Sequence, residues 1–142
     1  MADHMAIEMF FRHSESKLLI CAPCKFISEK GKSCYVDNGQ YNWTVNPGRT
    51  ANIYHQNFSK LIDESPDWSL NQIQTAIELG ATLVPYSGFH ERNLEVGKAT
   101  SDTLENSKGD LLIAFTFDKS LSGGTKHAWD NATIQSKVHL HL

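Results

Sequence analysis

The sequence has no excess of positive charge and no long apolar run. Its 142 residues carry 13 Lys and Arg against 16 Asp and Glu, which gives a formal net charge of -3. A chain with this balance has no general field that attracts polyanions, so we expect no nucleic-acid binding. No window reaches the roughly 18 consecutive apolar residues that a membrane-spanning helix needs, so no membrane partner is expected.

The first residues also lack the pattern of a secretion signal. The segment MADHMAIEMFFRHSESK contains acidic residues and histidines where a signal peptide would be basic and then apolar. We therefore expect a cytosolic or nuclear protein, with the cytoplasm as the predicted compartment. The length and the 40% hydrophobic content predict a single domain over residues 1–142.

The sequence contains three cysteines, an odd number. Cys21 and Cys24 have the C-x-x-C spacing of zinc and redox sites, and with Cys34 they would need His13 or His55 to complete a zinc site. Cys21, however, lies inside the apolar run LLICAPCKFI, where a reduced cysteine acts as a small hydrophobic residue. We expect reduced, structural cysteines, with no metal and no cofactor.

Segments with strand and helix patterns alternate along the chain. The expected strands are 18–21, with an extension to residue 27, 82–85, 111–117 and 138–142. The expected helices are 49–62, 70–79 with Ser69 as N-cap and Gly80 beyond its end, 90–99 and 125–133. Helices between buried strands predict a three-layer, Rossmann-like α/β fold with a small, mainly parallel sheet.

A turn signal interrupts this alternation. Asp37, Asn38 and Gly39 lie between aromatic and β-branched residues, which is typical of a hairpin turn. We therefore expect a β-hairpin inserted over residues 34–45.

The most informative segment is LLIAFTFDKSLSGGTKHAWDN, an apolar strand followed by two glycines and a helix. Gly123 and Gly124 allow close approach of a ligand to the backbone, and the first N–H groups of a helix have no intrahelical partner. The Thr125 hydroxyl and the backbone around Lys126 add donors. This order predicts an anion site, with a phosphate as the expected ligand.

Several side chains are candidates to complete that site. Arg92 has planar donors suited to phosphate oxygens, unless it pairs with Glu95 or Asp102 at the surface. Asn93 would orient a ribose or base, or serve its helix. The remaining ligand-binding candidates are His127, Trp129, Arg49 and Tyr54, and for Trp129 packing against the sheet is the alternative.

These motifs resemble those of a known superfamily. The run FHERN, the strand ending LIAF and the turn GGT are similar to the signature of the Rossmann-like nucleotide-binding superfamily. That superfamily includes the lonely-guy phosphoribohydrolases, often called lysine decarboxylases, and DNA-processing proteins. The resemblance covers roughly residues 70–142. It implies that Arg92 contacts the phosphate-sugar part of a nucleotide-like ligand and that the chain forms homodimers.

The chain departs from the hydrolases at the catalytic position. Three residues after Thr125, where the resembled family has a glutamate, this chain has Ala128. Glycosidic hydrolysis needs a carboxylate, which Glu91 or Asp130 would have to supply. Whether the protein is an enzyme therefore stays open. The sequence favours a protein that senses or sequesters a nucleotide-derived molecule, with a phosphoribohydrolase or nucleoside-processing hydrolase as the alternative.

Overall fold

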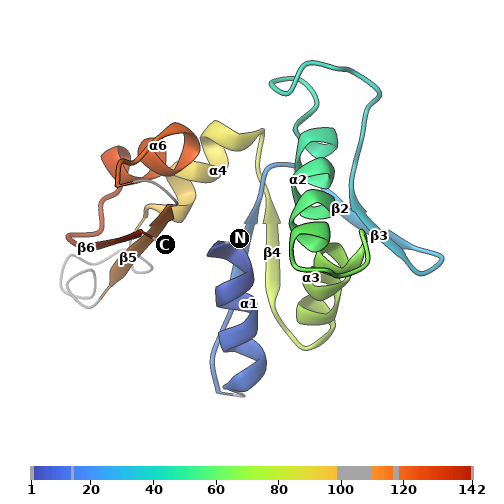
Figure 1. The fold of residues 1–142 in the computed structure, drawn as a ribbon, viewed down its shortest axis with the longest axis horizontal. Coiled ribbons are helices and arrows are strands. Elements are labelled where there is room, and N and C mark those ends of the chain that lie inside the picture. The colour runs from blue at the N-terminus through green and yellow to red at the C-terminus, as the bar shows by residue number, and fades with distance from the viewer. Residues whose placement is uncertain (1, 14, 99–109, 117–118, 142) are drawn as a thin grey trace. The chain divides into compact units, whose positions relative to one another are not determined.

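The computed structural model describes residues 2–13, 15–98, 110–116 and 119–141 (Figure 1). The chain divides into two compact units, Met1–Phe89 and His90–Leu142, and each is described by itself. The single domain expected over residues 1–142 stays a prediction.

In the first unit, two short strands pair in parallel. Strand β1 (Leu19–Ala22) lies beside β4 (Thr82–Pro85), with Leu19 opposite Thr82 and Ala22 opposite Pro85. The predicted strand at 82–85 is confirmed, as is most of the one at 18–21. The extension of the first strand to residue 27 is wrong, because Pro23 ends β1 and a proline has no N–H for the ladder.

Three helices complete the first unit: α1 (Ala2–Arg12), α2 (Pro47–Leu61) and α3 (Trp68–Glu78). The two helices predicted over residues 49–62 and 70–79 are confirmed as α2 and α3, whereas α1 is not among the predicted helices. Gly80 lies past α3 with a φ of +103°, as its predicted place after the helix requires. The buried apolar residues of the first unit are Ile7, Ala22, Tyr35, Ala51, Leu70, Ile73, Ala76 and Ala81.

Ser69 is not the N-cap of α3. The cap position is Asp67, one residue before the helix begins, and Ser69 lies in the first turn with no exposed surface. Its N–H donates to the Ser59 hydroxyl at 3.0 Å, and its own hydroxyl lies between the rings of His4 and His55. Serine is a common N-cap residue, but here contacts among α1, α2 and α3 bury the Ser69 side chain.

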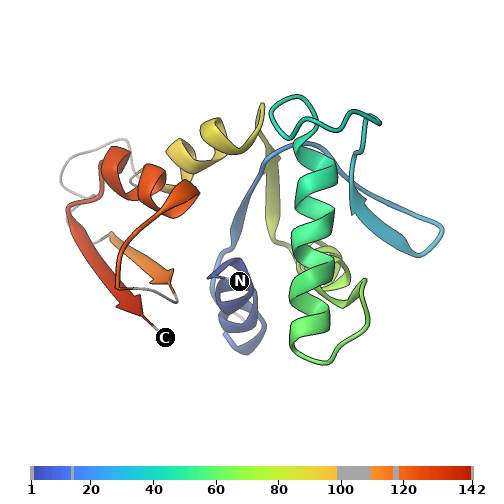
Figure 2. The same cartoon turned by 45° about the horizontal axis from the view of Figure 1, so that its top comes forward.

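The expected hairpin is present at a different place in the chain. Strands β2 (Phe26–Glu29) and β3 (Lys32–Tyr35) pair antiparallel beside α2 (Figure 2). Their connecting residues, Lys30 and Gly31, both have positive φ, which matches the right-handed twist of a two-residue hairpin. The hairpin predicted over residues 34–45 is therefore wrong.

Side-chain hydrogen bonds explain that error. Asp37 Oδ1 accepts from the Gly39 N–H at 2.8 Å and from Asn46 Nδ2 at 2.6 Å, and Asn46 Nδ2 also reaches Gln40 O at 2.7 Å. Asp and Asn side chains that bond to nearby backbone replace the bonds of a strand ladder. Residues 36–46 form a loop for this reason.

The second unit has a strand–helix–strand crossover. Strands β5 (Leu111–Thr116) and β6 (Ser136–His141) pair in parallel, Leu111 opposite Ser136, and α6 (Gly123–Asn131) connects them. Helix α4 (Phe89–Val96) precedes them. The strands and helices predicted in this region are present, but α4 ends at Val96 and α6 ends at Asn131, before the predicted ends. Residues 99–109, 117 and 142 lie outside the described residues.

The fold class is therefore mixed α/β. Five helices and six strands lie in the described parts of the chain, and two of the three two-stranded sheets are parallel. The three-layer, Rossmann-like arrangement stays a prediction. None of the described helices is long and apolar enough to cross a membrane.

Candidate anion-binding turn

The start of α6 presents an exposed helix N-terminus. Gly123 has a φ of +53°, and the preceding Ser122 is extended and makes no side-chain cap bond. Lys126 N–H bonds back to Ser122 O at 3.1 Å, whereas the three N–H groups before it have no acceptor within the helix. Gly123, Gly124 and Thr125 are all exposed, so these donors face solvent. We call this segment the 123–126 turn.

A buried amide of α4 lies directly against this turn. Asn93 is only 6% exposed, and its Nδ2 would lie 2.9 Å from a Cβ atom added at Gly124. No hydrogen bond joins the Asn93 amide to another described residue. Glycine at position 124 therefore allows a polar side chain of α4 to approach the first turn of α6.

Glycine also brings the far ends of α4 and α6 together. A Cβ at Gly97 would lie 3.0 Å from Ala128 O and from the Cα and Cβ of Ala132, and Thr133 N donates to Gly97 O at 3.0 Å. At the near end, the rings of His90 and His127 meet edge to face with centroids 5.0 Å apart. The side of α4 that carries His90 and Asn93 is thus packed on α6, as is Gly97 directly after α4.

The other predicted residues of α6 lie differently. Lys126 Nζ and Asp130 Oδ2 form an exposed ion pair at 2.5 Å. The Trp129 ring lies near the His139 ring, with Lys137 Nζ 5.7 Å from its centroid, and the Lys137 amine also donates to Trp129 O at 2.7 Å. Trp129 therefore packs on β6, which agrees with the expected alternative of packing against the sheet.

Two predicted residues of α4 adjoin Asn93. The Arg92 side chain is half-buried with its Nε buried, and Glu91 is exposed. Across from them, His127 Nδ1 is buried and has no hydrogen-bond partner among the described residues. The α4 side chain that lies against Gly124 is Asn93. A contact of Arg92 with a ligand stays a prediction.

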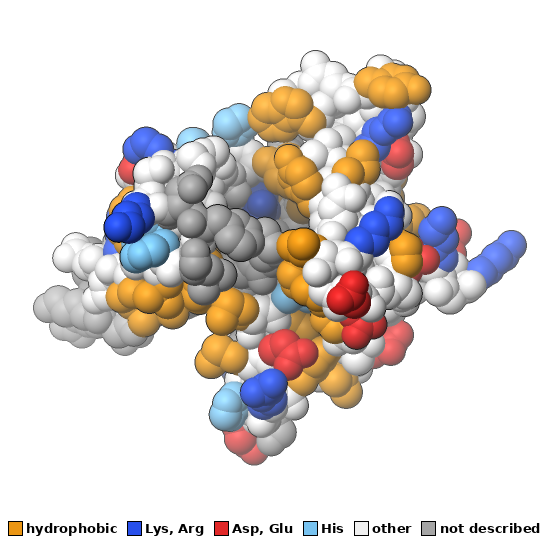
Figure 3. Space-filling view, in the orientation of Figure 1, with side chains coloured by type: hydrophobic (Ala, Val, Ile, Leu, Met, Phe, Trp, Pro, Cys, Tyr) orange, Lys and Arg blue, Asp and Glu red, His pale blue; other side chains and the backbone are white. Residues whose placement is uncertain are grey.

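Arg49 and Tyr54 belong to the first unit. The Arg49 guanidinium lies 4.2 Å from the centroid of the Tyr41 ring, and the Tyr54 ring lies 6.4 Å from that of Phe89. Tyr41 is 87% exposed and Tyr54 is 64% exposed, and apolar side chains gather on this part of the surface (Figure 3). A contribution of Arg49 and Tyr54 to the 123–126 turn stays a prediction.

The cysteines are all free thiols. Burial raises the pKa of the Cys24 thiol, and its Sγ would lie 3.0 Å from a Cβ at Gly48. Among the residues that the structure describes, no group of three or more His, Cys, Asp or Glu side chains is arranged to hold a metal ion.

Sequence reasoning missed one buried polar group. His4 of α1 and His55 of α2 both contact the Ser69 hydroxyl of α3, the latter through Nδ1 at 2.7 Å. The His4 ring also stacks on Phe58, with centroids 4.8 Å apart. The spacing of His4 and Ile7 could have predicted this, because it puts both residues on the side of a helix whose apolar residues face the core.

Comparison with known proteins finds sequence similarity to a mimiviral protein. The uncharacterized protein R261 of Acanthamoeba polyphaga mimivirus is 28% identical over 142 residues. The match covers 99% of this chain and 66% of that protein, so the chain spans slightly less than two thirds of its relative. No protein-family model and no solved structure matches. Membership of the Rossmann-like superfamily stays a prediction.

Proposed function

We propose that the 123–126 turn, together with Asn93, binds the phosphate of a nucleotide-derived small molecule. The observation that carries this proposal is the Asn93 amide, a buried polar group placed against an exposed helix N-terminus. A ligand oxygen at this position would accept from Asn93 Nδ2, a donor that makes no hydrogen bond to another described residue.

The chemistry of the turn favours an anion. Helix N–H groups and the positive end of the helix dipole both stabilise negative charge, and the Asn93 Nδ2 is a further donor. The nucleotide part of the proposal rests on the resemblance of the FHERN and GGT motifs to the nucleotide-binding superfamily.

In this proposal the protein senses or sequesters its ligand and catalyses no reaction. Ala128 stands at the position where the resembled hydrolases have their glutamate, and the Asp130 carboxylate is paired with Lys126. A relocated-carboxylate hydrolase would need Glu91 or Asp130 to act on the substrate. Release of free base from nucleoside monophosphates would favour that alternative.

Thermal unfolding of the full chain tests the proposal. A nucleoside monophosphate present at a hundred times its Kd should stabilise the folded state by about 2.7 kcal/mol, because it binds that state alone. The panel is AMP, GMP, ribose 5-phosphate, adenosine and inorganic phosphate. We expect the phosphorylated compounds to raise Tm, adenosine to have little effect, and Asn93→Ala to remove most of the increase.

Asn71→Ala is the matched control, because Asn71 is an exposed asparagine on α3. It should keep the full increase in Tm. The proposal is wrong if no phosphorylated compound raises the Tm of the unaltered chain, or if Asn93→Ala and Asn71→Ala respond alike.

A further inference from the structure

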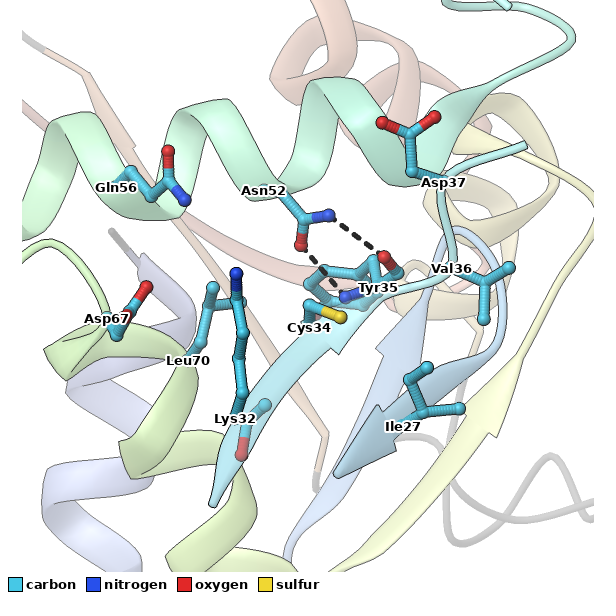
Figure 4. Close-up of a pocket in the computed structure, with 11 residues that line it drawn as sticks. Ile27, Lys32, Cys34, Tyr35, Val36, Asp37, Asn52, Gln56, Asp67 and Leu70 are labelled. Carbon is cyan, nitrogen blue, oxygen red and sulfur yellow. Dashed lines mark hydrogen bonds between the residues drawn. The ribbon is translucent and has the colours of Figure 1, made fainter. Parts of the chain in front are cut away.

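A pocket opens at the surface of the first unit, and none of its lining residues is assigned to phosphate binding. It has a volume of about 380 Å³, within the range of small-molecule sites (Figure 4). Residues of the hairpin, α2 and α3 line it. The lining residues that matter here are Ile27, Lys32, Cys34, Gln56, Asp67 and Leu70.

Two opposite charges border this cavity without pairing. No ion pair within 4.0 Å joins Lys32 to Asp67, and neither side chain has another ion pair or hydrogen bond among the described residues. Asp67 occupies the N-cap position of α3, yet its side chain makes no cap bond. Figure 4 shows Lys32, Asp67 and the amide of Gln56 around one space.

The neighbouring polar groups, in contrast, have partners. Asn52 accepts from the Tyr35 N–H at 2.8 Å and donates to Tyr35 O at 2.9 Å, so its amide completes the outer edge of β3. The Asn46 amide and the Gly39 N–H hold the pKa of Asp37 below its ordinary value. Lys32, Asp67 and Gln56 are therefore the groups left for a ligand.

We propose that this cavity binds a free α-amino acid as a zwitterion. Its carboxylate bonds to Lys32 Nζ, its ammonium group to the Asp67 carboxylate, and the Gln56 amide contacts either group. Ile27, Cys34 and Leu70 provide the apolar wall for its side chain. A zwitterion can pair with both charges that border the pocket, whereas a ligand with one charge can pair with only one of them.

Calorimetric titration of the full chain with each common amino acid tests the proposal. We expect at least one amino acid to bind at millimolar concentration or below. Its N-acetyl derivative lacks the ammonium group and its amide lacks the carboxylate, so each should bind at least about tenfold more weakly. These analogues test both contacts on the unaltered protein.

Two variants test the protein side of the same contacts. Lys32→Gln and Asp67→Asn should each weaken binding at least about tenfold, since each removes one charge-assisted hydrogen bond. The controls are Lys60→Gln and Glu64→Gln, which change exposed residues that do not line the cavity and should leave the affinity unchanged.

The outcomes also separate this site from the phosphate turn. Asn93→Ala should leave amino-acid binding unchanged, and nucleoside monophosphates should not compete with it. The proposal is overturned if no amino acid binds, if blocked analogues bind as well as free ones, or if the control variants weaken binding as much as Lys32→Gln and Asp67→Asn.

Discussion

At the scale of single residues, Gly48 shows how one missing methyl group permits a close contact. It lies buried in the first turn of α2, where a Cβ atom would be 1.9 Å from Val36 O. The same turn begins at Asn46, which is 1% exposed and whose Oδ1 accepts from the Arg49 N–H at 3.3 Å. The loop before α2 therefore touches the helix through backbone.

Gly48→Ala should lower the free energy of unfolding by at least about 2 kcal/mol, because the overpacking cost exceeds the gain of about 1 kcal/mol in helix propensity. Urea denaturation measures the change. Asn57→Ala, at an exposed position of the same helix, should stay within about 0.5 kcal/mol of the unaltered chain. Equal stability of the two variants would contradict the contact with Val36.

At the scale of elements, one hydroxyl joins three helices. Ser69 of α3 contacts the ring nitrogens of His4 on α1 and His55 on α2. A hydroxyl has one proton to donate, so one ring nitrogen accepts that proton and the other ring donates its own to the Ser69 oxygen. The three helices are thereby linked through a site that excludes water, since His4 is 5% exposed and Ser69 is fully buried.

Ser69→Ala should destabilise the protein by about 1–3 kcal/mol, because it removes a buried partner from two imidazole rings. Urea denaturation at neutral pH provides the measurement. Ser65→Ala, in the exposed loop before α3, is the matched control and should change stability little. If both variants unfold at the same urea concentration, the hydroxyl does not hold the helices together.

At the scale of the whole molecule, the two proposed sites lie in different units of the chain. Lys32 and Asp67 belong to Met1–Phe89, whereas Asn93 and the 123–126 turn belong to His90–Leu142. The mimiviral relative is longer than this chain and spans both units. Homodimer formation, which the resemblance implies, stays a prediction.

Hydrogen exchange should therefore show two separate patterns of ligand protection. A bound amino acid should slow exchange mainly in β3, α2 and α3, and a bound nucleoside monophosphate mainly in α4 and the start of α6, because binding stabilises the elements that contact the ligand. Mass spectrometry of peptides from the full chain resolves these regions. Protection of the same peptides by both ligands would contradict two separate sites.

Local patterns predicted much of the secondary structure. The strand at 82–85, the glycine after α3 and the helix that begins at Gly123 all depend on residues close together in sequence. The hairpin was misplaced because Asp37-Asn38-Gly39 resembles a hairpin turn, while the side chain of Asn46 directs those residues into a loop.

The sequence by itself determined the alternation of strands and helices and the glycine turn at the start of α6, since apolar periodicity and backbone freedom act over a few residues. Only the tertiary structure decided that Asn93 lies against Gly124, and that Lys32 and Asp67 border one cavity without pairing. These residues are 31 and 35 positions apart in the chain. Their proximity depends on how helices and strands pack, which local patterns do not specify.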